Sequence, residues 1–149
     1  MYDLTKHFLA DKKQILSKIE SVLNRGILEM GEEVEQFEEN FRKYCGAKYC
    51  VTVSSGSMGL LLALKSLNLN KNDEVITVSN SDIPTSHAIS LVGAKIKWID
   101  IKANTLNIDE DIIEKNITKK TKVILPVHMF GNPCKMSKIK SIAKKFKLK

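Results

Sequence analysis

The chain has 149 residues, of which 43% are hydrophobic and 28% are charged. This composition is that of an ordinary globular protein, and it excludes a disordered tail, a collagen-like rod and a disulfide-stapled mini-protein. No run of 18 uncharged apolar residues is present, so we expect no membrane-spanning helix.

The cysteines and the N-terminal residues bear on the cellular compartment. Cys45, Cys50 and Cys134 are odd in number and lack CxxC spacing, which fits reduced thiols and argues against a zinc site. The first ten residues contain charged side chains and no signal-peptide core. We therefore expect a cytoplasmic protein without a metal site.

The net charge of +7 is confined to the C-terminal segment. Residues 135–149 carry seven lysines and no acid, so residues 1–134 have balanced charge. Charge runs of this kind are usually the solvated face of a helix. We expect that arrangement here and expect no nucleic-acid partner, with an anionic partner as the alternative.

Two hydrophobic periodicities divide the chain. Apolar residues at helical spacing predict a helical segment over residues 1–48, and β-rich runs alternating with helices follow over residues 49–149. Alternating strands and helices are typical of right-handed βαβ units, so we predict an α/β fold: a parallel sheet with helices on both faces. The predicted elements are helices 11–24 and 32–44, strand 49–54, helix 58–67, strand 74–79, a helix ending near 91, strand 95–101, helix 109–117, strand 122–128 and helix 137–146.

This architecture reads as incomplete. The predicted helix 58–67 is apolar nearly all round and should be buried within something larger. The last helix, 137–146, predicts a further strand after it. We therefore expect this chain to be the beginning of a larger domain.

A Ser/Gly loop, Ser54–Gly59, leads from the predicted first strand directly into an apolar helix. The free N–H groups of a helix's first turn, together with the helix dipole, form an anion site. The loop contains neither GxGxxG nor Gly-Lys-Ser/Thr, so it is not a dinucleotide or Walker loop. It is either a phosphate site or a plain helix cap.

Four stretches together resemble the DegT/StrS family of sugar aminotransferases, which use pyridoxal 5'-phosphate (PLP). They occur in the family's order and spacing over essentially the whole chain, and they are Gly31–Glu38, Val53–Leu64, Gly93–Asp100 with Asn104–Asp109, and Pro126–Cys134. The resemblance implies a fold type I aminotransferase. Residues 1–48 are then its N-terminal helical segment, and residues 49–149 are the first half of its PLP-binding large domain.

The resemblance also implies site residues. Gly56, Ser57 and Met58 fall on the family's turn whose backbone amides hold the cofactor phosphate. Asp82 falls where the family usually has an aromatic ring that stacks on the pyridine, and its alternative role is a helix N-cap. His128 and Met30 are expected near the substrate.

The activity implied is transfer of an amino group, typically from glutamate, to a keto-sugar nucleotide by a homodimer. No lysine of the chain falls on the family's Schiff-base motif, so we expect no catalytic residue here and no transaminase activity from this chain alone. Two alternatives remain. One is a PLP-dependent sugar dehydratase, and the other is a small non-catalytic α/β module that binds a phosphorylated ligand.

Overall fold

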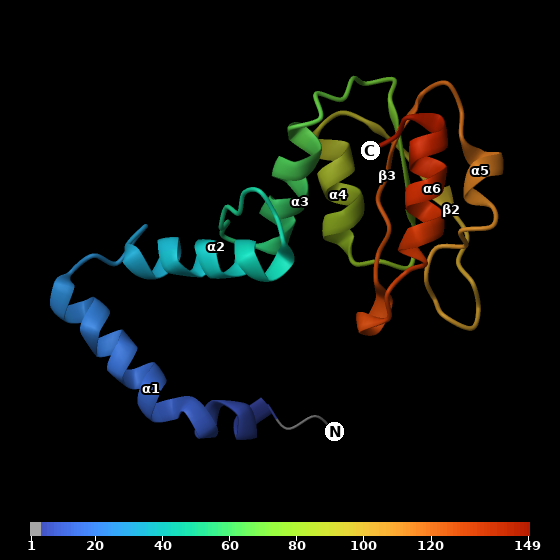
Figure 1. Ribbon diagram of the computed structural model, residues 1–149. Helices are drawn as coiled ribbons and strands as arrows, with labels where there is room; N and C mark the ends of the chain where they lie inside the picture. Colours follow the sequence, from blue (N-terminus) through green and yellow to red (C-terminus); the bar gives the residue numbers. More distant parts are fainter. Residues whose placement is uncertain (1–3) are drawn as a thin grey trace. The chain divides into compact units, whose positions relative to one another are not determined.

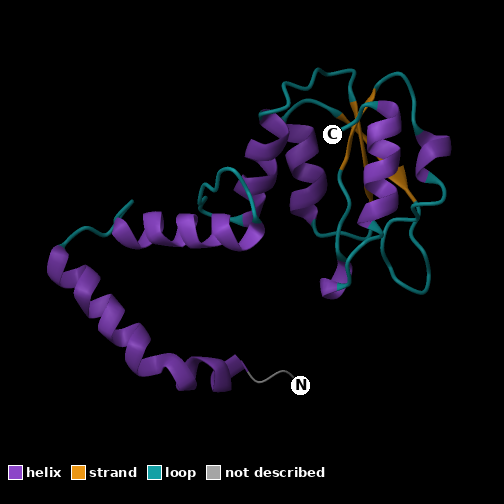
Figure 2. Ribbon diagram, viewed as in Figure 1, coloured by secondary structure: helices purple, strands orange, loops and turns teal. Residues whose placement is uncertain are grey.

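The computed structural model describes residues 4–149. The chain divides into two compact units, of which the first ends at Thr52 and the second is Val53–Lys149. Strands occur only in the second unit, within the described residues (Figure 2). The assignment of residues 1–48 and 49–149 to a helical segment and a larger domain stays a prediction.

The first unit consists of two helices, α1 (Leu4–Arg25) and α2 (Glu32–Cys45). Helix α1 begins seven residues before the predicted start, because residues 4–10 contain no Gly or Pro that would stop it. Helix α2 has its predicted bounds to within a residue. It begins with three acids in its first turn and is capped at its C-terminus by Gly46, which has a positive φ of 63°. This conformation lets the amides of Gly46 and Ala47 donate to carbonyls of the last turn of the helix.

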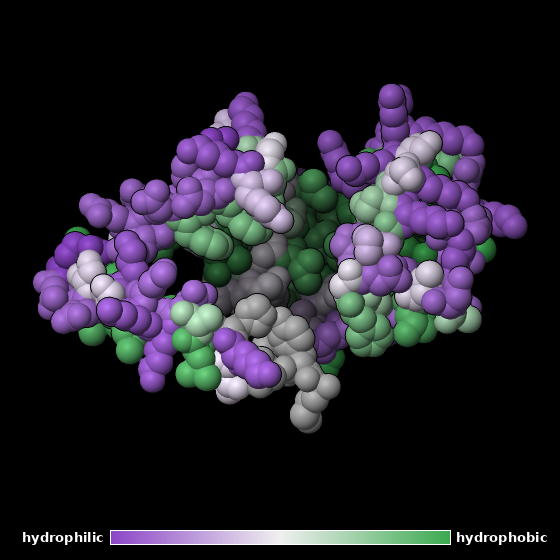
Figure 3. All heavy atoms as spheres, turned by 60° about the horizontal axis from the view of Figure 1, so that its bottom comes forward, coloured by the Kyte–Doolittle hydropathy of each residue, from purple (hydrophilic) through white to green (hydrophobic). Residues whose placement is uncertain are grey.

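Apolar side chains in this unit lie at the surface. Helix α2 has no buried residue, although the rings of Phe37 and Phe41 stack with centroids 5.7 Å apart. Figure 3 shows such hydrophobic side chains (green) among the hydrophilic ones on one face of the molecule. On α1 the exposed apolar residues include Ile15, Leu16, Ile19 and Leu23.

The second unit is built on a three-stranded parallel sheet in the order β2-β1-β3. The strands are β1 (Glu74–Val78), β2 (Lys95–Ile99) and β3 (Thr121–Ile124). The central strand β1 is buried along Val75–Val78, as its apolar sequence predicts for a strand covered on both faces.

Helices cover both faces of this sheet (Figure 1). Helices α3 (Gly56–Lys65) and α4 (Ile83–Leu91) pack on the face that Val75 and Val123 present. Helices α5 (Ile113–Asn116) and α6 (Met136–Phe146) pack on the opposite face. The predicted α/β architecture is therefore confirmed. The second face buries Ile76, Val78, Ile99, Ile108, Ile113, Ile124, Cys134, Ile139 and Ile142.

The predicted strand 49–54 is wrong: this segment has no regular structure. Instead of pairing with a neighbouring strand, the amide and the hydroxyl of Thr52 donate to the carboxylate of Glu38, at 2.6 and 2.8 Å. Val51 and Val53 are exposed. A β-rich run forms a strand only where a partner edge is available, and none is paired with it in the described chain.

Two predicted helices also differ. Helix α3 starts at Gly56, and of its residues only Leu64 is buried, in the cluster that it shares with β1, β3 and α4, so the expectation of a largely buried helix is not met. The predicted helix 109–117 shrinks to α5. There the carboxylate of Asp109 accepts the Asp111 amide at 3.0 Å, a local turn that competes with helix formation.

The C-terminal residue lies along the outer side of β3. The Lys149 amide donates to the Lys122 carbonyl, and the Ile124 amide donates to the Lys149 carbonyl, both at 2.9 Å. These two bonds have the pattern of a parallel ladder. A further strand at this edge stays a prediction.

Candidate functional site

Three loops meet at one edge of the sheet because parallel strands end at the same edge. The loop after β1 leads into α4, the loop after β2 covers residues 100–112, and the loop after β3 leads to α6. Open α/β sheets bind ligands at this carboxyl edge. The sequence-predicted residues Asp82 and His128 lie in these loops.

The N-terminus of α3 is open to an anion. Ser55 caps the helix, and its hydroxyl accepts the amide of Met58 at 3.2 Å. Within the described part of the chain the amides of Gly56 and Ser57 donate to no acceptor, and both residues are exposed. The first turn contains no acid. A side chain at Gly56 would meet nothing within 4 Å, so the space beside this backbone is free.

A cavity of about 230 Å³ adjoins this turn. Ser57 and Met58 of α3 line it together with the capping residue Ser55, and Pro84 and His87 line it from α4. The two helices run side by side from the same edge, so the structure brings the predicted phosphate residues next to the start of α4.

The N-terminus of α4 is capped by the acidic residue that precedes it, Asp82. The carboxylate of Asp82 accepts the Ile83 amide at 2.8 Å, and Pro84 follows in the first turn. Asp82 is thus the N-cap that the sequence allowed as one of its two roles. The Asp82 carboxylate is thus hydrogen-bonded to the backbone of its own helix. A carboxylate also has no ring that could stack on a pyridine.

His128 lies on the turn that follows β3. Its Nδ1 accepts the backbone amide of Cys134 at 3.0 Å, so the neutral ring carries its hydrogen on Nε2. The Cys134 thiol donates to the carbonyl of Val127 at 3.1 Å, and burial raises the pKa of this thiol. The predicted strand 122–128 ends earlier, at Ile124, so His128 is a turn residue and not the end of a strand.

Met30 belongs to the first unit, whereas the other predicted site residues belong to the second. It has a positive φ of 48° and an exposed side chain. A contact of Met30 with substrate stays a prediction.

Two asparagines at the carboxyl edge escaped the sequence analysis. Asn107 is 4% exposed, and both ends of its amide bond to the turn that carries His128. Asn80 donates to the Leu106 carbonyl at 2.8 Å, while its Oδ1 is buried and has no partner within the described residues. The signal for Asn107 was a polar residue between two apolar ones, of which Ile108 becomes buried and Leu106 stays exposed.

A charged cluster fixes the loop after β2. The Lys102 ammonium lies 2.6 Å from the carboxylate of Glu110, which is buried, and 2.5 Å from that of Asp111. Lys138 of α6 also pairs with Asp111. The hydrogen bonds from Lys102 and Lys138 lower the pKa of Asp111 to about 2. Part of the lysine-rich tail is therefore engaged in tertiary ion pairs and not only in solvent.

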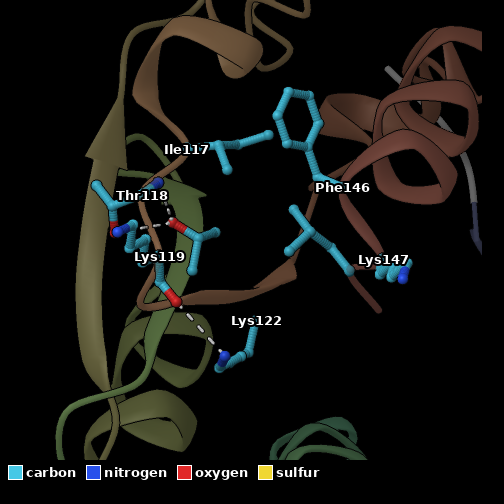
Figure 4. Close-up of a pocket in the computed structure, with 8 residues that line it drawn as sticks. Ile117, Thr118, Lys119, Lys122, Phe146 and Lys147 are labelled. Atoms are coloured by element: carbon cyan, nitrogen blue, oxygen red, sulfur yellow. Dashed lines mark hydrogen bonds between the residues drawn. The ribbon is translucent and has the colours of Figure 1, made fainter.

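A wider cavity, of about 610 Å³, lies at the opposite, amino edge of β3. Figure 4 shows Ile117, Lys119 and Lys122 on one side of it and Phe146 and Lys147 on the other. This cavity and the carboxyl-edge loops lie at opposite ends of the strands, so the cavity is not part of the candidate site. Among residues 4–149 we find no cluster of three or more His, Cys, Asp or Glu side chains that could hold a metal ion. None of the described helices combines the length and the hydropathy that a membrane span requires.

A parallel α/β sheet with an open helix N-terminus at its carboxyl edge is an arrangement in which α/β proteins bind anionic groups such as phosphate. The DegT/DnrJ/EryC1/StrS aminotransferase family matches residues 10–149. The chain belongs to this family.

Similar proteins include transaminases and a dehydratase. The chain is 41% identical over 147 residues to dTDP-3-amino-3,6-dideoxy-alpha-D-galactopyranose transaminase of Aneurinibacillus thermoaerophilus, covering 99% of this chain and 40% of the relative. It is 40% identical over 130 residues to GDP-4-keto-6-deoxy-D-mannose 3-dehydratase of Escherichia coli O55:H7, covering 83% of this chain and 34% of the relative.

Solved structures give the same fold. DesV of S. venezuelae superposes with a TM-score of 0.92 at 33% identity, over 98% of this chain and 39% of DesV. NtdA of Bacillus subtilis, which holds the cofactor PMP, gives a TM-score of 0.89 at 38% identity, over 94% of this chain and 32% of NtdA. The chain thus spans about two fifths or less of the length of these relatives.

Proposed function

We propose that this chain is the cofactor-phosphate-binding part of a PLP-dependent aminotransferase that acts on keto-sugar nucleotides. The observation that carries the proposal is the 41% identity to a sugar-nucleotide transaminase over nearly the whole chain. We propose glutamate as the amino donor because a relative that is 39% identical to this chain over 137 residues is the 3-oxo-glucose-6-phosphate:glutamate aminotransferase of Bacillus subtilis.

The donor set at α3 fits a phosphate. Two exposed amides, those of Gly56 and Ser57, have no recorded acceptor among the residues described, and the Ser57 hydroxyl adds a third donor. No acid in the first turn opposes an anion, and the helix dipole favours one. The Met58 amide, which the resemblance also assigns to phosphate, is engaged by the Ser55 cap.

In this proposal the residues of the chain bind and orient. Gly56 and Ser57 hold the phosphate, and Ser55 keeps the first turn of α3 in place. When bound, PLP supplies an electron sink for the transfer of the amino group. His128 offers its Nε2–H as a hydrogen-bond donor to a substrate oxygen at the carboxyl edge.

The assembly and the compartment form part of the same proposal. Cys45, Cys50 and Cys134 are unpaired, which fits a reducing compartment, and we place the protein in the cytoplasm. We propose a homodimer, as the resemblance to the family implies. None of the lysines of this chain is proposed to bind the cofactor covalently.

A dehydratase is the second candidate function. A GDP-4-keto-6-deoxy-D-mannose 3-dehydratase is 40% identical to this chain, almost as similar as the transaminase. Both readings need the same phosphate site, so α3 does not separate them.

Binding of PLP, with pyridoxal as the probe that lacks phosphate, tests the phosphate site. We expect PLP to bind more tightly than pyridoxal, and Ser57→Asp to abolish the difference because its carboxylate occupies the anion position. Ser57→Ala removes one hydrogen bond to a charged group, which is worth about tenfold or more in affinity.

The matched control is the same pair of changes at Ser66, the C-cap of the same helix, whose hydroxyl donates to the Ala63 carbonyl at 2.7 Å. These variants should leave the affinity for PLP unchanged. Equal binding of PLP and pyridoxal by the unaltered chain would refute the phosphate site.

A further inference from the structure

Asn107 holds the turn after β3 at both of its ends. Its Oδ1 accepts the amide of Met129 at 3.0 Å, and its Nδ2 donates to the carbonyl of Asn132 at 3.0 Å. These partners lie 22 and 25 residues along the chain from Asn107. The residue is 4% exposed, so its own amide is shielded from solvent and its two hydrogen bonds are partly buried.

A tight loop places Asn107 in this position. Ile101 and Ile108 form an antiparallel bridge, and the Lys102 amide donates to the Asn107 carbonyl at 3.0 Å. Next to Asn107, Ile108 is 1% exposed and belongs to the core beside α5 and α6. The backbone of Asn107 is therefore fixed before its side chain reaches the turn.

The turn that Asn107 holds is strained. Phe130 has a φ of 52° and Gly131 has a φ of 78°, so two successive residues are in the left-handed region. Glycine tolerates this conformation, whereas phenylalanine does not without cost. Such backbone persists only where the surroundings over-determine it. The ring of Phe130 is 87% exposed and supplies no packing for this purpose.

His128 stands immediately before the residue that Asn107 binds. Its Nδ1 accepts the Cys134 amide, and this bond closes the loop from the other side. If the Met129 amide were released, the His128 backbone would gain the freedom to move the ring away from Cys134.

We propose that Asn107 is a positioning residue, which holds the His128–Asn132 turn so that His128 keeps Nδ1 on the Cys134 amide and presents Nε2–H at the carboxyl edge. The use of that hydrogen for a substrate oxygen rests on the proposed function. The clamp itself is a property of this chain alone.

The experiment uses nitrogen-15 NMR of the imidazole in the 149-residue chain, which reports which ring nitrogen carries hydrogen. In the unaltered chain we expect His128 to be in the Nε2–H form and the Met129 amide to exchange slowly with solvent. Asn107→Ala removes both bonds to the turn, and we expect the ratio of Nδ1–H to Nε2–H to rise roughly two- to tenfold, the shift that loss of one net hydrogen bond produces.

Two further variants separate positioning from general stability. Asn107→Asp keeps an acceptor for Met129 but loses the donor to Asn132, so its effect on the ring should be smaller than that of Asn107→Ala. The control is Asn116→Ala, which removes a 2.9 Å bond from an asparagine to the Ile112 carbonyl and should leave His128 unchanged. The amide signals of buried β1 residues check that each variant is folded.

The inference is wrong if folded Asn107→Ala leaves the tautomer ratio unchanged, or if Asn116→Ala changes it equally. It is also wrong if the Met129 amide of the unaltered chain exchanges at the rate of an unprotected amide, a result that needs no variant to fold. Failure to bind PLP would refute the proposed phosphate site and leave this outcome unaffected.

Discussion

The two units of the chain owe their structure to different forces. In α2 no residue is buried, and its ion pairs join residues no more than eight apart: Arg42 and Lys43 contact Glu39 on the same helix, and Glu33 pairs with Arg25 at the end of α1. In the second unit β1 is buried along four of its five residues, and ion pairs such as Lys138–Asp111 join segments far apart in sequence. Short isolated helices are only marginally stable in water. The first unit therefore depends on interactions between residues close in sequence, whereas the second unit is also stabilised by its buried core.

The largest difference between the units should appear when a core side chain is truncated. Ile76 is fully buried in the central strand, and Ile76→Ala should lower the free energy of unfolding by about 2–5 kcal/mol. The matched change in the first unit, Phe41→Ala, removes a ring that is 47% exposed. Because this change removes the stacking on Phe37 but no buried core, it should cost about 0.5–1.5 kcal/mol, less than Ile76→Ala. Urea unfolding of both variants measures the comparison, and equal losses would contradict it.

A smaller effect is expected at the start of α4. Asp82→Ala removes the cap of the Ile83 amide and should cost about 1 kcal/mol. Asp82→Asn keeps a capping oxygen and should recover most of this loss. If Asp82→Ala were neutral in urea unfolding, the carboxylate would not be held by its helix and its other role, toward the cofactor, would gain weight.

The smallest effect concerns acid, since the ion pairs involved are exposed to solvent. The pKa of Asp111 is lowered to about 2 from the ordinary 3.8 by hydrogen bonds from Lys102 and Lys138. A lowered pKa in the folded state means that the carboxylate stabilises the fold above pH 3.8 and that this contribution is lost as the pH falls toward 2. The unfolding midpoint of the second unit should therefore fall over that interval, and Asp111→Asn should flatten the decline.

Glu39 offers the comparison within the first unit. Its pKa is also lowered to about 2, by Arg42 and then Lys43, but its partners lie on the same helix. Glu39→Gln should change only the helical circular dichroism of α2 on acidification. A change in the unfolding of the second unit would show that the two units are coupled.

Much of the fold followed from the sequence because its signals were local. The apolar runs of β1 and β3, the stripe of α6 and the Asp82-Ile83-Pro84 start of α4 all lie within a few residues. The expected strand 49–54 failed because a strand depends on a partner edge, which the residues of the run do not encode. The length of α5 failed because the Asp109 carboxylate competes locally for an amide that a longer helix would use.

The candidate site divides in the same way. The open turn at Gly56 and Ser57 was predictable, because a capping serine followed by glycine is a sequence signal. The clamp by Asn107 was not, since its partners Met129 and Asn132 come near it only through the parallel crossing from β2 to β3. In the sequence, the one sign of Asn107's role was its position as a polar residue between two apolar ones. Whether these residues serve a cofactor and a substrate stays a prediction.

The rate at which the Cys134 thiol is chemically modified reports how often the turn opens. It is 5% exposed and donates to the Val127 carbonyl, and its burial raises the pKa of the thiol, so alkylating reagents must wait for the surrounding backbone to open. Cys45 is exposed and should be modified at once. The ratio of the modification rates of Cys45 and Cys134 therefore measures how often the loop beside His128 opens locally.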